Sequence, residues 1–248
     1  MRKLLALAAV ALFMITSCSD DDTTTTPIDN TLLQKMITTS EDGMVTTSNY
    51  NYDGNRIISM ITSDGNSTIY TYTGNLITNV KTIQNNNITV ETIIEYNSSN
   101  KKISEIILIS GPDLGVAQGT KETYTYNQNG TITFNAYSGD LASQTTFEGT
   151  GTITFNENII QHEGMDQETY KHVLDTKNNP MKNILGYNEY MKPHFDGNQN
   201  FVTAYTTPLR SVFIFTYTYN LNNYPVTSIE KVYQLNKYVT FQKQYFYE

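Results

Sequence analysis

Apolar and polar residues alternate along most of this chain. In residues 123–126 and 130–134, Tyr, Ile and Phe occupy alternate positions and Thr lies between them. Alternation of this kind predicts β-strands with one packed face and one wet face. Two-residue turn signals separate the alternating runs, which predicts hairpins. The clearest turn signals are Asp53-Gly54, Asp64-Gly65 and Asn129-Gly130.

The alternating runs belong to an imperfect internal repeat. Each unit has the form Tyr-x-Tyr, a short turn, and an apolar residue that starts a second alternating run. Tyr52 and Tyr72 are 20 residues apart, which is enough for two strands and two tight turns. The sequence therefore predicts an all-β fold, an antiparallel β-meander of hairpin repeats that forms a curved or barrel-like sheet. The clearest copies are residues 50–61, 70–80 and 124–134.

The outward positions of these strands predict a soluble sheet. They are mostly Thr, Asn, Lys and Glu, whereas a membrane-spanning barrel needs an outer band of aliphatic side chains. The chain also ends in Glu248, where outer-membrane barrels usually have an aromatic residue. We therefore expect a fold that is soluble rather than membrane-spanning.

One long irregular segment interrupts the strand pattern, from about residue 178 to 208. It contains three prolines, and a short helical turn is expected over 187–191. The run 211–219 is apolar on both faces in its first half, so we expect the insertion to cover that strand. A long irregular segment is also where a binding site is expected.

The first residues have the composition of an export signal. Arg2 and Lys3 precede an apolar run over residues 4–15, which is too short to cross a bilayer as a stable helix. Cys18 is the only cysteine and follows two small residues, as lipoprotein cleavage requires. The sequence thus predicts a lipoprotein signal peptide over 1–17 and lipid attachment at Cys18, with a free thiol as the alternative.

A polar tether follows the predicted cleavage point. Residues 18–31 lack apolar periodicity, so we expect a tether that ends where a single β-repeat domain of residues 32–248 begins. The tether starts with an acidic run, which is interpreted either as an export signal or as a solvated spacer. The residues of this run are Ser19, Asp20, Asp21 and Asp22.

Several of these motifs resemble those of known bacterial proteins. Residues 15–18 are similar to the bacterial lipobox, and the acidic run after them resembles the surface-export signal of Bacteroidetes lipoproteins. Residues 50–56 resemble the YD repeats of large bacterial surface proteins. Residues 40–248 resemble a family of Bacteroidetes lipoproteins of unknown function, most closely over 168–184 and 217–225. The resemblance implies a porin-like β fold and a location in the outer membrane, but no activity and no functional residues.

The charge of the chain disfavours nucleic acid as a partner. The whole sequence has 16 basic and 24 acidic residues; loss of Arg2 and Lys3 with the signal peptide leaves 14 against 24, a net charge of −10. Binding to a phosphate backbone depends on patches of Lys and Arg. The partners expected instead are the membrane, through the lipid anchor, and a glycan or an envelope protein.

No residue pattern indicates a cofactor or a metal site. His162, His172 and His194 lack the helical spacing and the H-E-x-x-H order that hold zinc, so we interpret them as structural. Three Asp-Gly-Asn triplets lack the further oxygen ligands of a calcium loop and are interpreted as turns. We therefore expect neither a cofactor nor a bound metal. The triplets are residues 53–55, 64–66 and 196–198.

Catalytic signatures are missing as well. The sequence has neither the G-x-S-x-G of serine hydrolases nor the G-x-x-x-x-G-K of phosphate-binding loops. Five glutamates lie on segments that could face one cleft, and a suitably spaced pair would permit glycoside hydrolysis. We predict a protein that is not an enzyme, with a polysaccharide-acting hydrolase as the alternative. The glutamates are Glu91, Glu95, Glu122, Glu148 and Glu168.

The repeat tyrosines have two interpretations. Exposed rings would stack on sugars, whereas rings that alternate with Thr are typical of a sheet core, and the alternation favours the core. We predict a lipid-anchored cell-envelope lipoprotein that is a non-catalytic binding or interaction module. Its expected location is the outer membrane, on the cell surface or on the periplasmic face. The tyrosines are Tyr50, Tyr72, Tyr124, Tyr126, Tyr217 and Tyr219.

Overall fold

The repeated hairpins form a single ring of strands. The computed structural model describes residues 29–111, 117–164, 169–207, 212–234 and 237–248. The described part contains sixteen strands and one short helix, α1 (Tyr187–Met191). The strands are β1 (Leu33–Ser40), β2 (Val45–Asp53), β3 (Arg56–Thr62), β4 (Ser67–Thr73), β5 (Leu76–Gln84), β6 (Asn87–Tyr96), β7 (Lys102–Ile109), β8 (Gln118–Tyr126), β9 (Ile132–Gly139), β10 (Thr146–Asn156), β11 (Ile159–Glu163), β12 (Thr169–Asn178), β13 (Gln199–Thr207), β14 (Val212–Tyr219), β15 (Pro225–Gln234) and β16 (Lys237–Tyr247).

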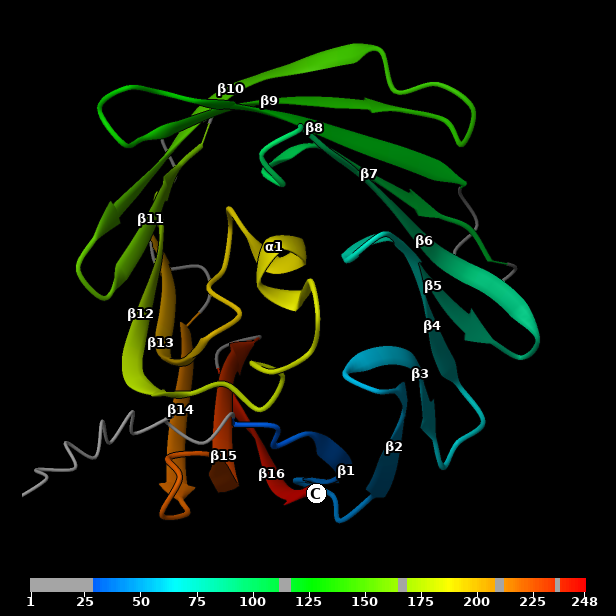
Figure 1. Cartoon of the computed structure of the whole chain (residues 1–248), viewed down its shortest axis with the longest axis vertical. Helices are drawn as coiled ribbons and strands as arrows, with labels where there is room; N and C mark the ends of the chain where they lie inside the picture. The colour runs from blue at the N-terminus through cyan, green and yellow to red at the C-terminus, as the bar shows by residue number, and fades with distance from the viewer. Residues whose placement is uncertain (1–28, 112–116, 165–168, 208–211, 235–236) are drawn as a thin grey trace, which may run out of the picture.

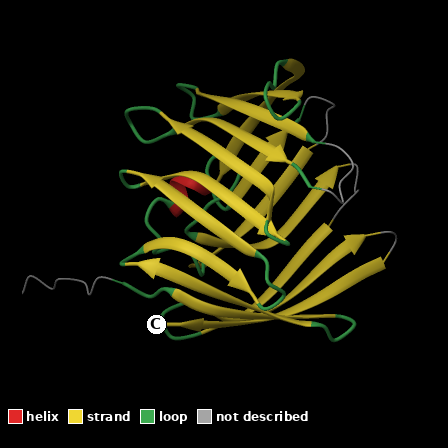
Figure 2. Ribbon diagram, turned by 90° about the vertical axis from the view of Figure 1, so that its right-hand side faces the viewer, coloured by secondary structure: helices red, strands yellow, loops and turns green. Residues whose placement is uncertain are grey.

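Every strand pairs antiparallel with its neighbours in sequence, and the first strand pairs with the last. Ile37 of β1 lies opposite Gln244 of β16, so the ring closes into a sixteen-strand barrel (Figures 1 and 2). Beyond these strands, Leu32 and Glu248 exchange two backbone hydrogen bonds of 2.9 and 3.0 Å. Closure leaves no strand edge unpaired.

This closure corrects the expected fold class. The all-β antiparallel meander is present, but the sheet is a complete barrel and not an open curved sheet. A closed antiparallel barrel is also the one β architecture that can span a membrane. The expectation of a soluble rather than membrane-spanning sheet, which rested on the polar outward positions, is therefore corrected: the sheet closes into an architecture that can span a membrane. The outer wall combines exposed isoleucines such as Ile61 and Ile69 with an ion pair between Lys81 and Glu91.

In several units of the repeat, the tyrosine before the turn ties its strand to the strand before it. The Tyr52 hydroxyl donates to the Leu33 carbonyl at the start of the preceding strand, over 2.7 Å. Tyr96, Tyr126 and Tyr247 make the same contact, to Ile77, Lys102 and Pro225 respectively, over 2.8 to 3.0 Å. A half-buried tyrosine needs such a partner for its hydroxyl. The Tyr-x-Tyr repeat is thus a structural device of the barrel wall.

A β-bulge lies next to the tyrosine before the turn in several units of the repeat. The pairing register shifts by one residue next to Tyr52, Tyr72, Tyr96 and Tyr219. Bulges increase the local twist of a strand pair, which helps a sheet to curve toward closure.

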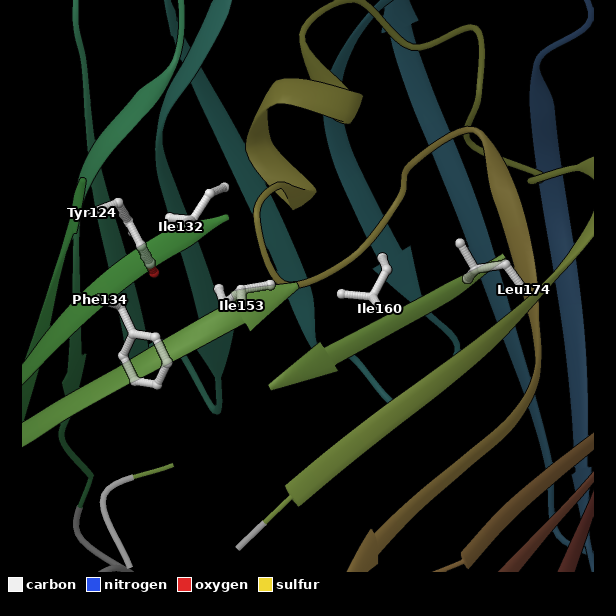
Figure 3. Close-up of a cluster of buried hydrophobic side chains, with 6 residues drawn as sticks. All are labelled: Tyr124, Ile132, Phe134, Ile153, Ile160 and Leu174. Carbon is white, nitrogen blue, oxygen red and sulfur yellow. The ribbon is translucent and has the colours of Figure 1, made fainter. Parts of the chain in front are cut away.

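The inner wall holds two apolar clusters. One lies on β8 to β12, and its side chains project from successive strands toward the lumen (Figure 3). The other joins β1, β2, β3 and β16 to the segment between β12 and β13. Among the six repeat tyrosines of the sequence analysis, Tyr50 and Tyr124 are buried core rings. The other four are half-buried on the same inner face: Tyr72, Tyr126, Tyr217 and Tyr219. The first cluster is Tyr124, Ile132, Phe134, Ile153, Ile160 and Leu174; the second is Leu33, Tyr50, Ile57, Ile184 and Tyr245.

Residues 179–198, here called the plug, enter the barrel lumen between β12 and β13 (Figure 1). The helix α1 of the plug spans 187–191, as the sequence predicts. The irregular segment is shorter than the expected 178–208, because residues 199–207 continue the meander as β13. The plug lies inside the barrel, facing the inner wall, instead of packing on the outside of a sheet.

The plug approaches one end of the barrel, here called the plugged end. Its Leu185 amide donates to the Asn55 carbonyl in the β2–β3 turn over 2.9 Å. Gly186 has φ 72°, and a Cβ there would lie 2.5 Å from the Asn75 carbonyl oxygen of the β4–β5 turn. Only glycine satisfies both the left-handed conformation and this close approach.

The described part of the chain also begins at the plugged end. Tyr224, in the β14–β15 turn, donates to Asp29 over 2.5 Å, and Asn183 of the plug donates to the Thr31 carbonyl over 3.0 Å. Cys18 and the acidic run 19–22 lie outside the described residues. Within the described part, no helix has the length and apolar character needed to span a membrane.

Candidate functional site

Four titratable side chains from distant parts of the sequence meet inside the barrel. Glu122 projects from β8, His162 from β11 and His172 from β12, while His194 belongs to the plug. All four line one cavity of about 460 Å³. The residues on β8, β11 and β12 lie close together because β8 to β12 are consecutive neighbouring strands of the barrel wall.

Strand register explains why these side chains point inward. Glu122 is two residues before Tyr124, which is buried in the apolar cluster of the inner wall. His162 pairs with Ile153, and His172 pairs with Ile160, both of which are buried in that cluster. Directly paired residues share a face, so the histidines continue the inner face of the barrel.

His194 of the plug connects Glu122 to His162. Its Nε2 lies 2.6 Å from Glu122 Oε2, and its Nδ1 lies 3.0 Å from His162 Nδ1. The other ring nitrogen of His162, Nε2, lies 3.2 Å from the His194 carbonyl oxygen. Tyr124 adds a hydroxyl donor 2.8 Å from Glu122 Oε2. The plug is therefore attached to β8 and β11 by a continuous hydrogen-bonded chain.

The hydrogen-bond partners determine where the protons lie. The His194 carbonyl can only accept, so His162 carries its proton on Nε2 and, when neutral, presents a lone pair on Nδ1. Burial lowers the pKa of His162 to about 3, so the ring is neutral at neutral pH. His194 must then donate from Nδ1, and the Glu122 carboxylate accepts from its Nε2. The Tyr124 hydroxyl also lies 2.9 Å from His194 Nε2, so the ring contacts Tyr124, Glu122 and His162 at once.

Glu122 is the carboxylate of this network. Burial alone would raise the pKa of Glu122, but hydrogen bonds from His194 and Tyr124 outweigh it and hold the pKa below its ordinary value. Burial, together with the charges of Glu122 and Glu105, raises the pKa of Tyr124 far above its ordinary range. Tyr124 therefore remains a neutral hydrogen-bond donor to this carboxylate.

A lysine–glutamate pair lies beside this network. Lys102 is 2% exposed, and its Nζ lies 3.3 Å from Glu105 Oε1. Burial lowers the pKa of Lys102, and the nearby Glu105 partly opposes this effect. The Tyr124 hydroxyl lies 3.4 Å from Glu105 Oε2, so one tyrosine contacts both carboxylates. The site thus contains two acid–base pairs, Glu122 with His194 and Glu105 with Lys102, around one phenol.

Three cavities adjoin this network. The 460 Å³ cavity is also lined by Tyr170 and Phe195, and a cavity of about 590 Å³ shares Glu122, Tyr170 and two of the histidines with it. A third, of about 680 Å³, lies at the plugged end between the plug and the turns after β6 and β8. Aromatic rings beside hydrogen-bonding groups are typical of ligand sites.

The structure brings together only some of the residues predicted as candidates. The three histidines meet, but among the described residues no three His, Cys, Asp or Glu side chains are grouped as a metal site. Of the five candidate glutamates, Glu122 faces the lumen and Glu148 lines the 590 Å³ cavity. Glu91 pairs with Lys81, and Glu95 is exposed. Glu168 lies outside the described residues.

The Asp-Gly-Asn triplets serve as turns, as predicted. Asp64 accepts the Asn66 amide over 3.3 Å, and Asp196 accepts the Asn198 amide over 2.8 Å. At the remaining triplet, Gly54 supplies the positive φ, 60°, of the β2–β3 turn. Each carboxylate of the first two triplets is occupied by its own turn.

Sequence reasoning missed Glu105, Lys102 and Phe195. Lys102 and Glu105 are three residues apart on β7, so strict alternation would place them on opposite faces. The bulge between β6 and β7 breaks that alternation and turns both side chains inward. Phe195 lies in the plug, where no periodic pattern exists. Bulges recur next to Tyr52, Tyr72 and Tyr96, so a bulge beside Tyr96 is the signal that points to the β7 pair.

The comparisons with known proteins give one distant structural likeness. No protein-family model matches the sequence, and no curated protein matches it. Among solved structures, the chain is similar to a porin-like protein from Bacteroides uniformis ATCC 8492, with 12% identity and a TM-score of 0.49. The match covers 87% of this chain and 96% of the other. A likeness this low carries no information about activity.

Proposed function

We propose that the protein is a lipid-anchored envelope lipoprotein whose barrel binds a ligand in the lumen without chemical conversion. The observation that carries this proposal is the 460 Å³ cavity between plug and wall. It combines the aromatic rings of Tyr170 and Phe195 with the polar groups of the histidine network. Rings supply stacking area and the polar groups supply orientation, which is the combination that sugars require. A glycan is therefore the first ligand class to test.

In this proposal the anchored segment joins the barrel at the plugged end. Lipid attachment at Cys18 rests on the sequence motif alone. The chain joins the barrel through Asp29 and Thr31 at the plugged end. Residues between Cys18 and Asp29 would span at most about 40 Å when fully extended. The plugged end would then face the membrane, and the opposite end would face away from it.

Glycan binding is tested with a matched pair of tyrosines. Tyr170 lines the lumen cavities and is 40% exposed, whereas Tyr238, on the outer wall, is 45% exposed. We expect the full-length protein to bind one or more glycans of an array saturably and without released sugar. Tyr170→Ala should weaken that binding by about tenfold, because a stacking ring is lost. Tyr238→Ala should leave the affinity unchanged; equal losses, or no binding at all, would contradict the proposal.

Lipidation has its own test. The full-length chain carrying Cys18→Ser should leave the membrane fraction and lose the mass of the acyl groups. Ser19→Ala, one position further, should keep both. Membrane association that survives Cys18→Ser would contradict a lipid anchor at this residue.

A polysaccharide hydrolase is the second candidate, because one tyrosine holds two carboxylates together. Glu105 and Glu122 both contact the Tyr124 hydroxyl, so their oxygens lie within about 6 Å, near the separation of retaining glycosidases. Such an enzyme needs a carboxylic acid with a raised pKa, whereas the pKa of Glu122 is lowered and Glu105 is paired with Lys102. The geometry favours binding over hydrolysis, and released sugar in the array assay would reverse this conclusion.

A further inference from the structure

Two ring nitrogens of the same kind face each other in the lumen. His162 Nδ1 and His194 Nδ1 are 3.0 Å apart, and the two rings are inclined by only 12°. Without another ligand, one proton must lie between the two nitrogens, because two lone pairs at this distance repel. A cation can take the place of that proton.

The opposite sides of both rings are already fixed. His194 Nε2 is held by the Glu122 carboxylate at 2.6 Å, and His162 Nε2 by the His194 carbonyl at 3.2 Å. Histidines that bind metals usually donate their second nitrogen to a carboxylate or a backbone carbonyl in this manner. Tyr124 in turn holds the Glu122 carboxylate at 2.8 Å. Both imidazoles are therefore oriented so that Nδ1 is the nitrogen available to a metal.

The geometry points to a two-histidine site for a divalent transition-metal ion, bound by His162 Nδ1 and His194 Nδ1. Metal–nitrogen bonds of about 2.0–2.1 Å to nitrogens 3.0 Å apart give an angle of about 95° at the ion. This angle suits neighbouring ligands of a square-planar or octahedral ion such as Cu²⁺ or Ni²⁺ better than tetrahedral Zn²⁺.

The remaining coordination positions are open to the lumen. Both histidines line the 460 Å³ cavity and the 590 Å³ cavity, so water or a ligand donor can reach the ion from either side. Among the described residues no third His, Cys, Asp or Glu completes a preformed metal group. Binding one ion displaces the shared proton, which leaves to solvent. The ion would join the plug to β11 in place of a single hydrogen bond.

This inference goes beyond the proposed glycan binding and uses the same cavity. The two can fail separately. Glycan affinity measured in chelator tests the cavity without the ion, and metal affinity measured without glycan tests the histidine pair alone.

Calorimetry with Ni²⁺ on the full-length, tag-free protein tests the site. We expect one ion per chain, and a loss of at least about 100-fold in affinity with either His162→Gln or His194→Gln. His172→Gln removes the third lumenal imidazole but neither proposed ligand, so it should change the affinity less than about threefold. Equal losses in all three variants, or no heat with the wild-type protein, would overturn the proposal.

A measurement on the wild-type protein guards against variants that do not fold. Electron paramagnetic resonance of the Cu²⁺ complex should show hyperfine coupling to two imidazole nitrogens at one Cu²⁺ per chain. Glu122→Gln should keep this spectrum and weaken Ni²⁺ binding by about 10- to 100-fold, because the carboxylate orients a ligand. A spectrum with oxygen ligands only would refute the site.

Discussion

The plug contacts opposite sides of the barrel in two different ways. On the side of β1 to β3 and β16, Ile184 is buried with Leu33, Tyr50 and Ile57 in an apolar cluster. On the side of β8 and β11, His194 makes hydrogen bonds and an ion pair instead. One end of the same short segment is thus held by burial, and the other by directional polar contacts.

The difference explains where the candidate site lies. Apolar burial is non-directional, so the Ile184 side holds the plug by packing alone, and the cavity of about 480 Å³ beside it is lined by Tyr50 and Tyr52 without a titratable plug residue. Polar contacts fix distances and angles, and the cavities around His194 are lined by the hydrogen-bonding groups of the network. The polar side of the plug therefore offers a ligand directional partners, and the apolar side holds the plug in the lumen.

Removing the apolar contact should have the largest effect on stability. Ile184→Ala deletes a side chain that is 3% exposed, and we expect the free energy of unfolding to fall by about 2–5 kcal/mol. Denaturant unfolding of the full-length protein measures this change. Leu221→Ala, at a fully exposed turn position, is the control and should stay within about 0.5 kcal/mol of wild type. A similar small effect at Ile184 would mean that the plug is not packed there.

Acid should weaken the polar side. Burial lowers the pKa of His162 to about 3, whereas the unfolded chain protonates near pH 6.5. Between these values the unfolded state binds a proton that the folded state does not. Stability is therefore lost as the pH falls from about 6.5 toward 3, by about 1.4 kcal/mol per pH unit for this one group.

Unfolding at a series of pH values measures this effect, and a variant isolates it from the other titrating groups. His162→Gln removes the histidine and should give a shallower decline between pH 6.5 and 4 than the wild-type protein gives. Glu122 changes stability in the same direction, because its lowered pKa makes its contribution disappear only in acid. Identical slopes for wild type and variant would show that His162 is not buried in its neutral form.

The barrel wall should respond least to loss of a single contact. Tyr52→Phe removes the hydroxyl that donates to the Leu33 carbonyl, and we expect a loss of about 0.5–1.5 kcal/mol. Tyr238→Phe on the outer wall is the matched control, with an expected change near zero. Chemical unfolding again provides the measurement. A zero effect at Tyr52 would remove the proposed role of the tyrosine repeat in linking strands.

Much of the wall could be predicted from sequence because its signals are local. The alternation around Tyr124 and the Asn129-Gly130 turn each need only a few neighbouring residues, and the structure has the predicted hairpin there. Closure could not be predicted in this way, because it depends on β1 meeting β16 across the whole chain. Hairpin propensity specifies each pair of strands but not the number at which the ring closes.

The candidate site was less accessible to sequence analysis. His162, His172 and His194 were recognised as a group, yet their spacing resembled no known site, and they were interpreted as structural. They meet because β11 and β12 are neighbours and because residues 179–198 turn inward instead of outward. The partner of His194, Glu122, is 72 residues away in sequence. Contacts of this range leave no periodic signal in a single sequence.

A double-mutant cycle between Glu122 and His194 tests the central claim most directly, namely that a polar contact attaches the plug to the wall. Glu122→Gln, His194→Gln and the double variant are unfolded in denaturant beside the wild type. The lumenal pair, which shares further hydrogen bonds with Tyr124 and His162, should show a coupling energy of about 1–3 kcal/mol, and the isolated outer pair of Lys81 and Glu91, treated in the same way, less than about 1 kcal/mol. Additive effects at Glu122 and His194, within about 0.5 kcal/mol, would contradict the account.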